Sequence, residues 1–159
     1  TVDCRMTDQT IYSEPVHERP ANDARDPVVR ATAMPTDANP YGGVFGGWLM
    51  GQMALGAGAL ASRIGQGKAV VVSATDFAFP GVMAVGDELS VYADVVEQGT
   101  TSLTISVESI GRERHGEAKT KVAAGTFKFV LLDEEGKPRP VSYESAAALS
   151  VPGSEHDNG

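Results

Sequence analysis

The segment NPYGGVFGGWLM, residues 39–50, places four glycines at the start of a predicted helix. Glycine opposes helix formation by about 1 kcal/mol relative to alanine, so glycines here indicate that something must approach the backbone closely. Apolar side chains then recur at spacings of three and four residues as far as residue 64, which is the helix period. The pattern predicts a helix over residues 45–64 that has almost no polar residues, is buried nearly all round and ends at Gly65 or Gly67.

The sequence after residue 68 has the pattern of strands, with β-branched and aromatic residues and alternation of apolar and polar side chains. Four segments show it: 69–79, 88–96, 102–110 and 120–133. A short apolar segment at residues 28–34 precedes the helix, and DEEGKP at residues 133–138 is typical of a turn. This order predicts an α+β fold in which an antiparallel β-sheet wraps around one long central helix. One helix cannot cover every face of such a sheet, so we expect self-association.

The chain of 159 residues has the size of one domain. Its net charge of -8 is concentrated at the ends, where residues 1–27 hold six acids and three bases, and residues 142–159 hold three acids and no base. Both ends lack periodicity, so we expect a flexible N-terminal arm (1–27) and a flexible C-terminal tail (142–159) around one domain at residues 28–141. That domain holds twelve acids and ten bases, which argues against nucleic-acid binding through a broad basic face.

The composition also bounds the chemistry and the location. The single cysteine, Cys4, rules out an intramolecular disulfide and a cysteine metal cluster, and no other metal-ligand spacing is present. His17, His115 and His156 stand in polar segments, so no Ser–His–Asp or Cys–His arrangement can be argued. The first residues carry no apolar signal region, and no run of about 18 apolar residues occurs. We therefore expect a cytoplasmic protein without a membrane span.

Three stretches of the chain together resemble one protein family. They read AMPTDANPYGGVFGGWLMGQM, FAFPGVMAVGDELSVYADVVEQGTTSLTISVE and FKFVLLDEEGKPRPV. These stretches are similar to the YciA-like branch of the hotdog-fold acyl-CoA thioesterases over residues 28–141, most specifically in FGGWLM, VGD (85–87) and QGTTS (98–102). The resemblance implies a hotdog fold, an acyl-CoA ligand with no further cofactor, dimers whose sheets join edge to edge, and often a trimer of dimers, which is a hexamer.

The resemblance further implies an active site at the dimer interface, where the start of the helix faces strands of the partner. Unpaired N–H groups at a helix start carry the positive end of the helix dipole. Those of Phe45, Gly46 and Gly47 are therefore expected to form an oxyanion hole for a thioester carbonyl, and a side chain at either glycine would block the carbonyl. The alternative is that the glycines serve only close helix–sheet packing or a tight turn into the helix.

The carboxylate that this family uses is missing from the sequence. In the YciA-like thioesterases an aspartate attacks the thioester or activates water, and its position corresponds here to Gly43. Gly43 can therefore contact the substrate but cannot act as the acid or base. A second acidic position of the family corresponds to Ala54. General-base catalysis contributes about 10²–10⁴-fold in rate. We expect an acyl-CoA thioesterase that uses another acid or a positioned water, with a catalytically weak or inactive acyl-CoA binding protein as the alternative. A hydratase of this fold would need an Asp and His pair, which finds no place here.

Three residues are candidates to replace that carboxylate. Asp37 lies six residues upstream of Gly43 in the same loop, although TDAN is also ordinary turn chemistry. Asn39 matches an asparagine of the family and can orient water or bind the carbonyl, but it cannot act as a base at neutral pH. Asp76 stands inside an apolar strand, where an acid must be paired, exposed or functional. The acidic residue of the family corresponds to Thr75, and a one-residue offset turns a side chain to the other face of a strand.

Coenzyme A carries phosphates, so its binding requires local cations in this acidic protein. Four basic residues cluster between the last two predicted strands: Arg112, Arg114, Lys119 and Lys121. A tight turn near which the family places its nucleotide supplies hydroxyl and N–H groups at Thr100, Thr101 and Ser102. The alternative is that the basic residues only keep a hairpin soluble. The acyl group is expected to lie along apolar side chains that are otherwise ordinary core residues: Phe45, Trp48, Met50, Phe77 and Phe79.

Overall fold

The computed structural model describes residues 25–141. Its elements are β1 (Val29–Thr32), a 3₁₀ turn η1 (Pro35–Asp37), α2 (Gly46–Gly65), β2 (Ala69–Ala78), β3 (Glu88–Gln98), β4 (Ser102–Arg112) and β5 (Lys119–Leu131). The predicted helix and strands are thereby confirmed, with ends that differ by at most two residues. The predicted arm and tail lie outside the described residues, apart from residues 25–27.

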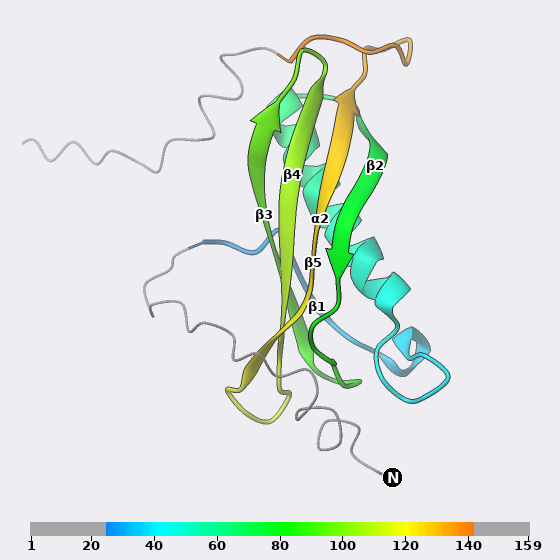
Figure 1. The fold of residues 1–159 in the computed structure, drawn as a ribbon, viewed down its shortest axis with the longest axis vertical. Coiled ribbons are helices and arrows are strands. Elements are labelled where there is room, and N and C mark those ends of the chain that lie inside the picture. The colour runs from blue at the N-terminus through cyan, green and yellow to red at the C-terminus, as the bar shows by residue number, and fades with distance from the viewer. Residues whose placement is uncertain (1–24, 142–159) are drawn as a thin grey trace, which may run out of the picture.

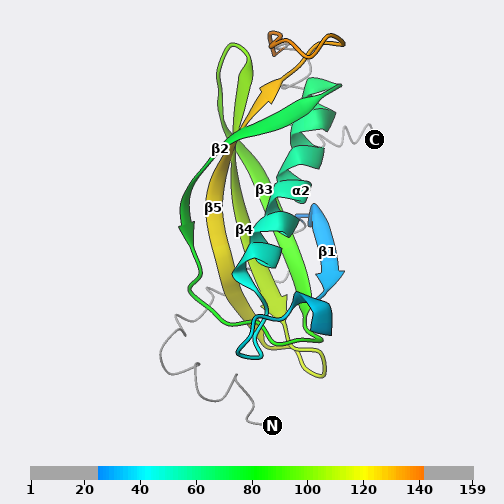
Figure 2. The same cartoon turned by 90° about the vertical axis from the view of Figure 1, so that its right-hand side faces the viewer.

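The five strands form one antiparallel sheet in the order β1-β3-β4-β5-β2. Figure 1 shows α2 behind this sheet, and Figure 2 shows from the side how the sheet curls around the helix. Short connections join β3, β4 and β5 in sequence, while β1 and β2, the strands on either side of α2 in the chain, take the two edges. The predicted α+β architecture of one helix in a curled antiparallel sheet is confirmed.

The core lies between α2 and the concave face of the sheet. Side chains alternate along β4, so Leu103, Ile105 and Val107 point towards the helix and are buried, while their neighbours face outward. The buried face of α2 recurs at helical spacing at Leu49, Met53, Ala57, Ala61 and Ile64. Small side chains at two of these positions let the helix lie close to the strands, which explains the tight curl of the sheet.

The prediction that α2 is buried nearly all round is wrong for a single chain. Its outer face carries Gly51, Leu55 and Ala59, all exposed, and Leu55 as a residue keeps 66% of its accessible surface. The neighbouring β2 is an edge strand whose Val71 and Val72 are also exposed. The physical reason is that five strands curl only far enough to cover one side of the helix. An apolar helix face and an apolar strand edge therefore lie uncovered side by side.

The two ends of the sheet hold different segments of the chain. At the start of α2, Gly43 forms a bridge with Ala84 in the turn before β3, and this end also holds the β4–β5 hairpin. At the end of α2 lies the β3–β4 turn, where the Thr101 carbonyl accepts a hydrogen bond from the N–H of Leu131 at 2.9 Å. Ser102 and Arg112, at opposite ends of β4, are ten residues apart, which is roughly 33 Å of extended strand.

The end of α2 differs from the prediction in its detail. The helix stops after Gly65, but the left-handed residue that terminates it is Gln66 (φ 53°), not a glycine. Glycine is needed at position 65 for another reason, because a side chain there would collide with Leu131 on β5. Arg139 closes this end by donating hydrogen bonds from its guanidinium group to the carbonyl of Gly65 and to that of Leu132, the latter at 3.0 Å.

We expect Arg139→Met to lower the free energy of unfolding by about 1–2 kcal/mol, because it removes a cation and hydrogen-bond donor from the negative end of the helix dipole. Urea unfolding at one fixed protein concentration measures this, since association adds to stability. Lys137→Met is the matched control, because the Lys137 side chain makes no ion pair or hydrogen bond within residues 25–141. Equal midpoints for the two variants would show that Arg139 does not stabilise the end of α2.

Candidate active site

The loop before α2 is folded by one amide side chain. The Oδ1 atom of Asn39 accepts hydrogen bonds from the N–H groups of Tyr41 (2.8 Å) and Gly43 (3.2 Å), and the Asn39 N–H donates to the Gly43 carbonyl (2.6 Å). These bonds close residues 39–43 into a tight turn, as asparagine side chains commonly do. Asn39 was predicted to have a catalytic or supporting role, and its oxygen has a structural role in this turn. Its Nδ2 atom lies near the position that a side chain at Gly43 would take.

The start of α2 presents two N–H groups rather than the three predicted. Phe45 is the N-cap residue, but its N–H donates to the Asp37 carbonyl at 2.8 Å, so it is no longer available to a ligand. None of the side chains that the structure describes caps the start of the helix. Within residues 25–141 no acceptor binds the N–H groups of Gly46 and Gly47. Two such donors at the positive end of a 20-residue helix have the chemistry to stabilise an oxygen that develops negative charge.

The two glycines at the helix start have different surroundings. A Cβ atom at Gly46 would make ordinary contact with the Phe79 ring at 3.6 Å, so packing within the chain does not require glycine there. A Cβ atom at Gly47 would overlap with the ring of Phe45, which folds back over the helix start. A side chain at position 47 would therefore displace the exposed Phe45 ring, whereas no contact within the described chain requires glycine at position 46.

Position 43 has room for the carboxylate that it lacks. Gly43 is buried and pairs with Ala84, and its backbone does not have a positive φ angle. A Cβ atom there would lie 3.5 Å from the Nδ2 atom of Asn39 and 3.7 Å from the Cγ1 atom of Val82, which are ordinary contacts. No steric or conformational demand explains the glycine. The second expected acidic position, Ala54, also has a small side chain, and it lies in the groove described below.

The two candidate aspartates have different surroundings. The Asp37 carboxylate accepts a hydrogen bond from the Met34 N–H at 2.8 Å, which closes the η1 turn and occupies this group locally. Asp76 is exposed, adopts a left-handed φ of 56° and forms a β-bulge with Phe77 opposite Gly125. The bulge places the Phe77 ring over Gly125, where a side chain would collide with it. Bulges commonly re-aim a side chain beside a functional site.

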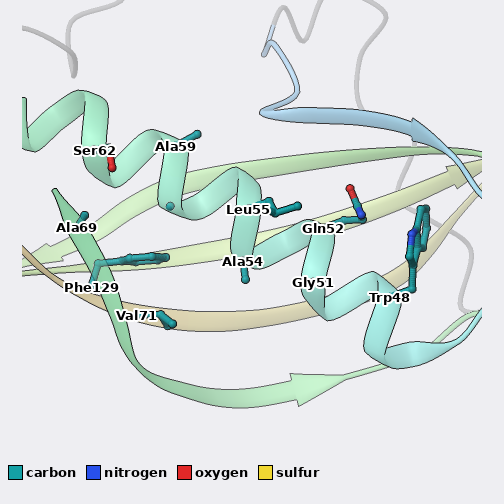
Figure 3. Close-up of a pocket in the computed structure, with 11 residues that line it drawn as sticks. Trp48, Gly51, Gln52, Ala54, Leu55, Ala59, Ser62, Ala69, Val71 and Phe129 are labelled. Carbon is teal, nitrogen blue, oxygen red and sulfur yellow. The ribbon is translucent and has the colours of Figure 1, made fainter. Parts of the chain in front are cut away.

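An apolar groove of about 700 Å³ runs along the uncovered side of α2 (Figure 3). It begins at Trp48, in the first turn of the helix, so the two N–H donors lie at its end. The helix supplies one wall, and β2 and β5 supply the other; the lining residues are Trp48, Gly51, Gln52, Ala54, Leu55, Gly58, Ala59, Ser62, Ala69, Val71 and Phe129. Among the predicted acyl contacts, only Trp48 lines this groove.

The other predicted acyl contacts lie elsewhere. Phe77 packs edge-to-face on Phe127 at 5.1 Å and belongs to the core side of the sheet. Phe45 and Phe79 flank Gly47 and Gly46 at the start of the helix, and Met50 is half-buried. Sequence reasoning missed the walls formed by Leu55, Val71 and Phe129, because helical spacing does not tell which apolar face the sheet leaves uncovered.

The predicted phosphate-binding residues do not come together in one chain. Arg112 is held between carboxylates, 3.0 Å from Glu88 and 3.8 Å from Glu117, and Arg114 donates to the Gly86 carbonyl at 3.2 Å. Both lie at the end where α2 starts. Thr100, Thr101 and Ser102 lie in the β3–β4 turn at the opposite end, where α2 finishes. Lys121 pairs with Glu108 at 3.6 Å, while Lys119, at the start of β5, is exposed.

Among residues 25–141, no group of three or more His, Cys, Asp or Glu side chains is placed to hold a metal ion. His115, the only histidine within residues 25–141, is exposed in the β4–β5 hairpin. No helix in the described part of the chain, α2 included, is both long and apolar enough to cross a membrane.

We expect Asn39→Ala to destabilise the protein by about 1 kcal/mol, because the N–H groups of Tyr41, in an exposed bond, and Gly43, in a part-buried one, lose their acceptor. Asn39→Asp, which keeps an acceptor oxygen and replaces only the Nδ2 donor, should retain most of this stability. Thermal unfolding of both variants separates the role of the oxygen from that of the amide. If the two substitutions lower the midpoint equally, the loop does not depend on the Oδ1 bonds.

Comparison with known proteins agrees with this geometry. The model of the thioesterase superfamily matches residues 41–115. YciA of Escherichia coli, an acyl-CoA thioester hydrolase, is 42% identical over 75% of this chain and 92% of its own length, and an uncharacterised acyl-CoA thioester hydrolase of Zymomonas mobilis is 40% identical over 84% and 88%. A hexameric hotdog-fold thioesterase of Campylobacter jejuni superposes with a TM-score of 0.75 at 29% identity, covering 79% of this chain and 97% of its own. The chain belongs to the thioesterase superfamily, in its YciA-like group of hotdog-fold acyl-CoA thioester hydrolases.

Proposed function

We propose that this protein hydrolyses acyl-CoA thioesters to a free acid and coenzyme A. The observation that carries the proposal is the pair of N–H groups of Gly46 and Gly47, unpaired at the start of a long helix and adjoining an apolar groove. A thioester carbonyl bound there would gain stabilisation as its oxygen becomes negative, and one such donor contributes about 2.7–4 kcal/mol in enzymes where it was removed. The reaction requires no cofactor besides the coenzyme A of the substrate.

The groove along α2 fits the acyl group. Its lining is almost wholly apolar, and Gln52 and Ser62 are the polar side chains in it. Four of its helix positions carry the smallest side chains, at Gly51, Ala54, Gly58 and Ala59, which leave space beside the helix. Burying an alkyl chain there would contribute about 0.8 kcal/mol per CH₂ group.

The assembly that we propose is a dimer joined through β2, and a trimer of such dimers. β2 is an edge strand with exposed apolar side chains at residues 70–72, and such an edge is a template for pairing with another strand. A second copy paired there would also cover the exposed face of α2 around Leu55. The thioesterase of Campylobacter jejuni is a hexamer, which supports the larger assembly. The site would then lie between two protomers.

Asp76 is the acid that we propose to replace the missing aspartate. It lies on the edge strand, three residues before Phe79, whose ring contacts the Gly46 position. Its carboxylate makes no hydrogen bond or ion pair within the described chain, and a second copy on β2 would enclose it. Burying an unpaired carboxylate is costly, so an acid on an edge that a second copy would cover is better accounted for by a role in activating water than by a purely solvated role.

The absence of a carboxylate at Gly43 favours a second candidate, an acyl-CoA binding protein without hydrolysis. Gly43 leaves the helix start and the groove intact, and the positions of both expected acids are occupied by residues without acidic groups. The two candidates share the bound ligand and differ only in turnover.

Coenzyme A phosphates would contact Arg114 and Lys119, while Arg112 is already paired with two carboxylates. Thr100, Thr101 and Ser102 would contribute from a neighbouring protomer, because they lie at the other end of the sheet. We also propose a cytoplasmic location. The support is the composition, because a chain with one cysteine cannot form an intramolecular disulfide, the bond typical of oxidising compartments.

The decisive experiment measures thiol release from short-chain, medium-chain and aromatic acyl-CoAs. We expect turnover by the native chain, and a loss of about 10²-fold or more in Asp76→Asn through the missing base. Asp26→Asn, at an exposed acid outside the sheet, is the control and should keep full activity. Retained activity in Asp76→Asn would exclude Asp76 as the base.

We also expect Gly43→Asp to raise the turnover, because its side chain fits beside Asn39. Gly43→Asn is the matched control, since it has nearly the same shape and no carboxylate. If the native chain releases no thiol but is stabilised thermally by a non-hydrolysable acyl-CoA analogue, and Gly43→Asp gains activity, the protein is a binder. If the analogue does not bind either, both candidate functions fail.

A further inference from the structure

The turn between β2 and β3 contains a buried carboxylate that the proposed chemistry does not use. Asp87 keeps only 5% of its accessible surface. Its Oδ2 atom accepts a hydrogen bond from the Ala84 N–H at 3.2 Å, and its Oδ1 atom accepts one from the Arg114 N–H at 3.3 Å. A buried carboxylate is costly unless it is hydrogen-bonded. Here it joins two segments, the turn itself and the β4–β5 hairpin.

The backbone around Asp87 is hydrogen-bonded to a third segment, the end of β1. The Ala33 N–H donates to the Asp87 carbonyl at 3.1 Å, and the Gly86 N–H donates to the Ala33 carbonyl at 2.7 Å. The guanidinium group of Arg114 also donates to the Gly86 carbonyl. Gly86 has a φ of 95°, which lets the chain reverse at this point. The turn is therefore held from both sides at the end of the sheet where α2 starts.

The loop before α2 pairs with this turn through backbone hydrogen bonds. Gly43 forms an antiparallel bridge with Ala84, and the Val44 N–H donates to the Met83 carbonyl at 3.0 Å. Ala84 is the residue whose N–H the Asp87 carboxylate binds. Two residues after Val44, the first N–H donor of the helix start is reached at Gly46. A continuous chain of hydrogen bonds therefore runs from the Asp87 side chain to the backbone that leads into the site.

We propose that Asp87 is a positioning residue for the thioester site, which fixes the Met83–Ala84 segment and through it the position of Gly43, Gly46 and Gly47. The inference rests on the proposed function for its kinetic consequence, and on the described contacts alone for its structural one. Because position 43 has no side chain, the placement of the backbone is all that the loop contributes there. A displacement of about 1 Å at such a site costs on the order of 10²-fold in rate.

The test compares Asp87→Asn with Asp133→Asn in the full-length, assembled protein. Asparagine keeps one acceptor oxygen and turns an NH₂ group towards one of the two N–H donors, so one of the bonds of Asp87 must break. Asp133 is the control for the change from carboxylate to amide in a turn: its Oδ1 atom alone accepts from two backbone N–H groups, those of Glu135 (3.0 Å) and Lys137 (2.9 Å), at the other end of the sheet. Asp133→Asn keeps this oxygen and both bonds, so it removes a turn carboxylate without breaking its hydrogen bonds and away from the site.

The readouts are hydrogen–deuterium exchange of the peptide over residues 39–49 and steady-state kinetics with an acyl-CoA that the native chain hydrolyses. For Asp87→Asn we expect faster exchange in this peptide and a kcat lowered roughly tenfold or more, with KM changed less than about threefold. Asp133→Asn should change neither. Asp87→Glu, which keeps both acceptor oxygens, is expected to recover part of the lost kcat.

The two readouts separate the possible failures. If exchange over residues 39–49 and kcat both stay at native values in Asp87→Asn while the unfolding temperature drops, Asp87 only stabilises its turn and the proposal is wrong. If the native chain hydrolyses no acyl-CoA, the proposed function fails, and the exchange experiment alone decides whether Asp87 positions the loop. Faster exchange with unchanged kcat would show that the loop position does not matter to the chemistry, which also overturns the proposal.

Discussion

The structure depends on the burial of a single helix against a sheet that is too narrow to enclose it. The inward face of α2, with Met53, Ala57 and Ala61, packs against β3, β4 and β5, and this contact forms the core that stabilises the domain. The outward face, with Leu55, is exposed within the described chain. Apolar surface left in water is unfavourable by roughly 25 cal/mol per Å². The same geometry that stabilises the domain thus leaves a groove for a ligand and an edge for a second copy.

The site at the start of α2 is made mainly of backbone, and side chains act mostly by placing it. Asn39 folds the loop, Asp37 closes the turn before it, and the Asp37 carbonyl accepts the N–H of Phe45. The N–H groups of Gly46 and Gly47 remain as the donors. This division explains how the chain has kept the architecture of its family while carrying glycine at position 43, since none of the bonds that build the loop uses a side chain there.

Much of the fold was predictable, because its signals are local. The helical spacing from Phe45 to Ile64 and the alternation in the four later strands gave element ends that differ from the structure by two residues or fewer. The bulge at Asp76 was not predictable, since it needs an extra residue opposite Gly125, and a regular strand would have turned Asp76 and Thr75 to opposite faces. The cap by Arg139 was missed because it joins residues 74 positions apart.

The sequence by itself determined the family, the single helix in an antiparallel sheet and the glycine-rich helix start, because periodicity and short motifs are properties of neighbouring residues. Only the tertiary structure decided that Phe45 loses its donor to Asp37, that Arg112 is already paired, and that Thr100 lies at the opposite end of the sheet from Arg114. It also decided that Asp87 joins three segments, two through its buried carboxylate and the end of β1 through its backbone carbonyl. The physical reason is that hydrogen bonds and ion pairs depend on distances in space, which the curl of the sheet sets and the spacing along the chain does not.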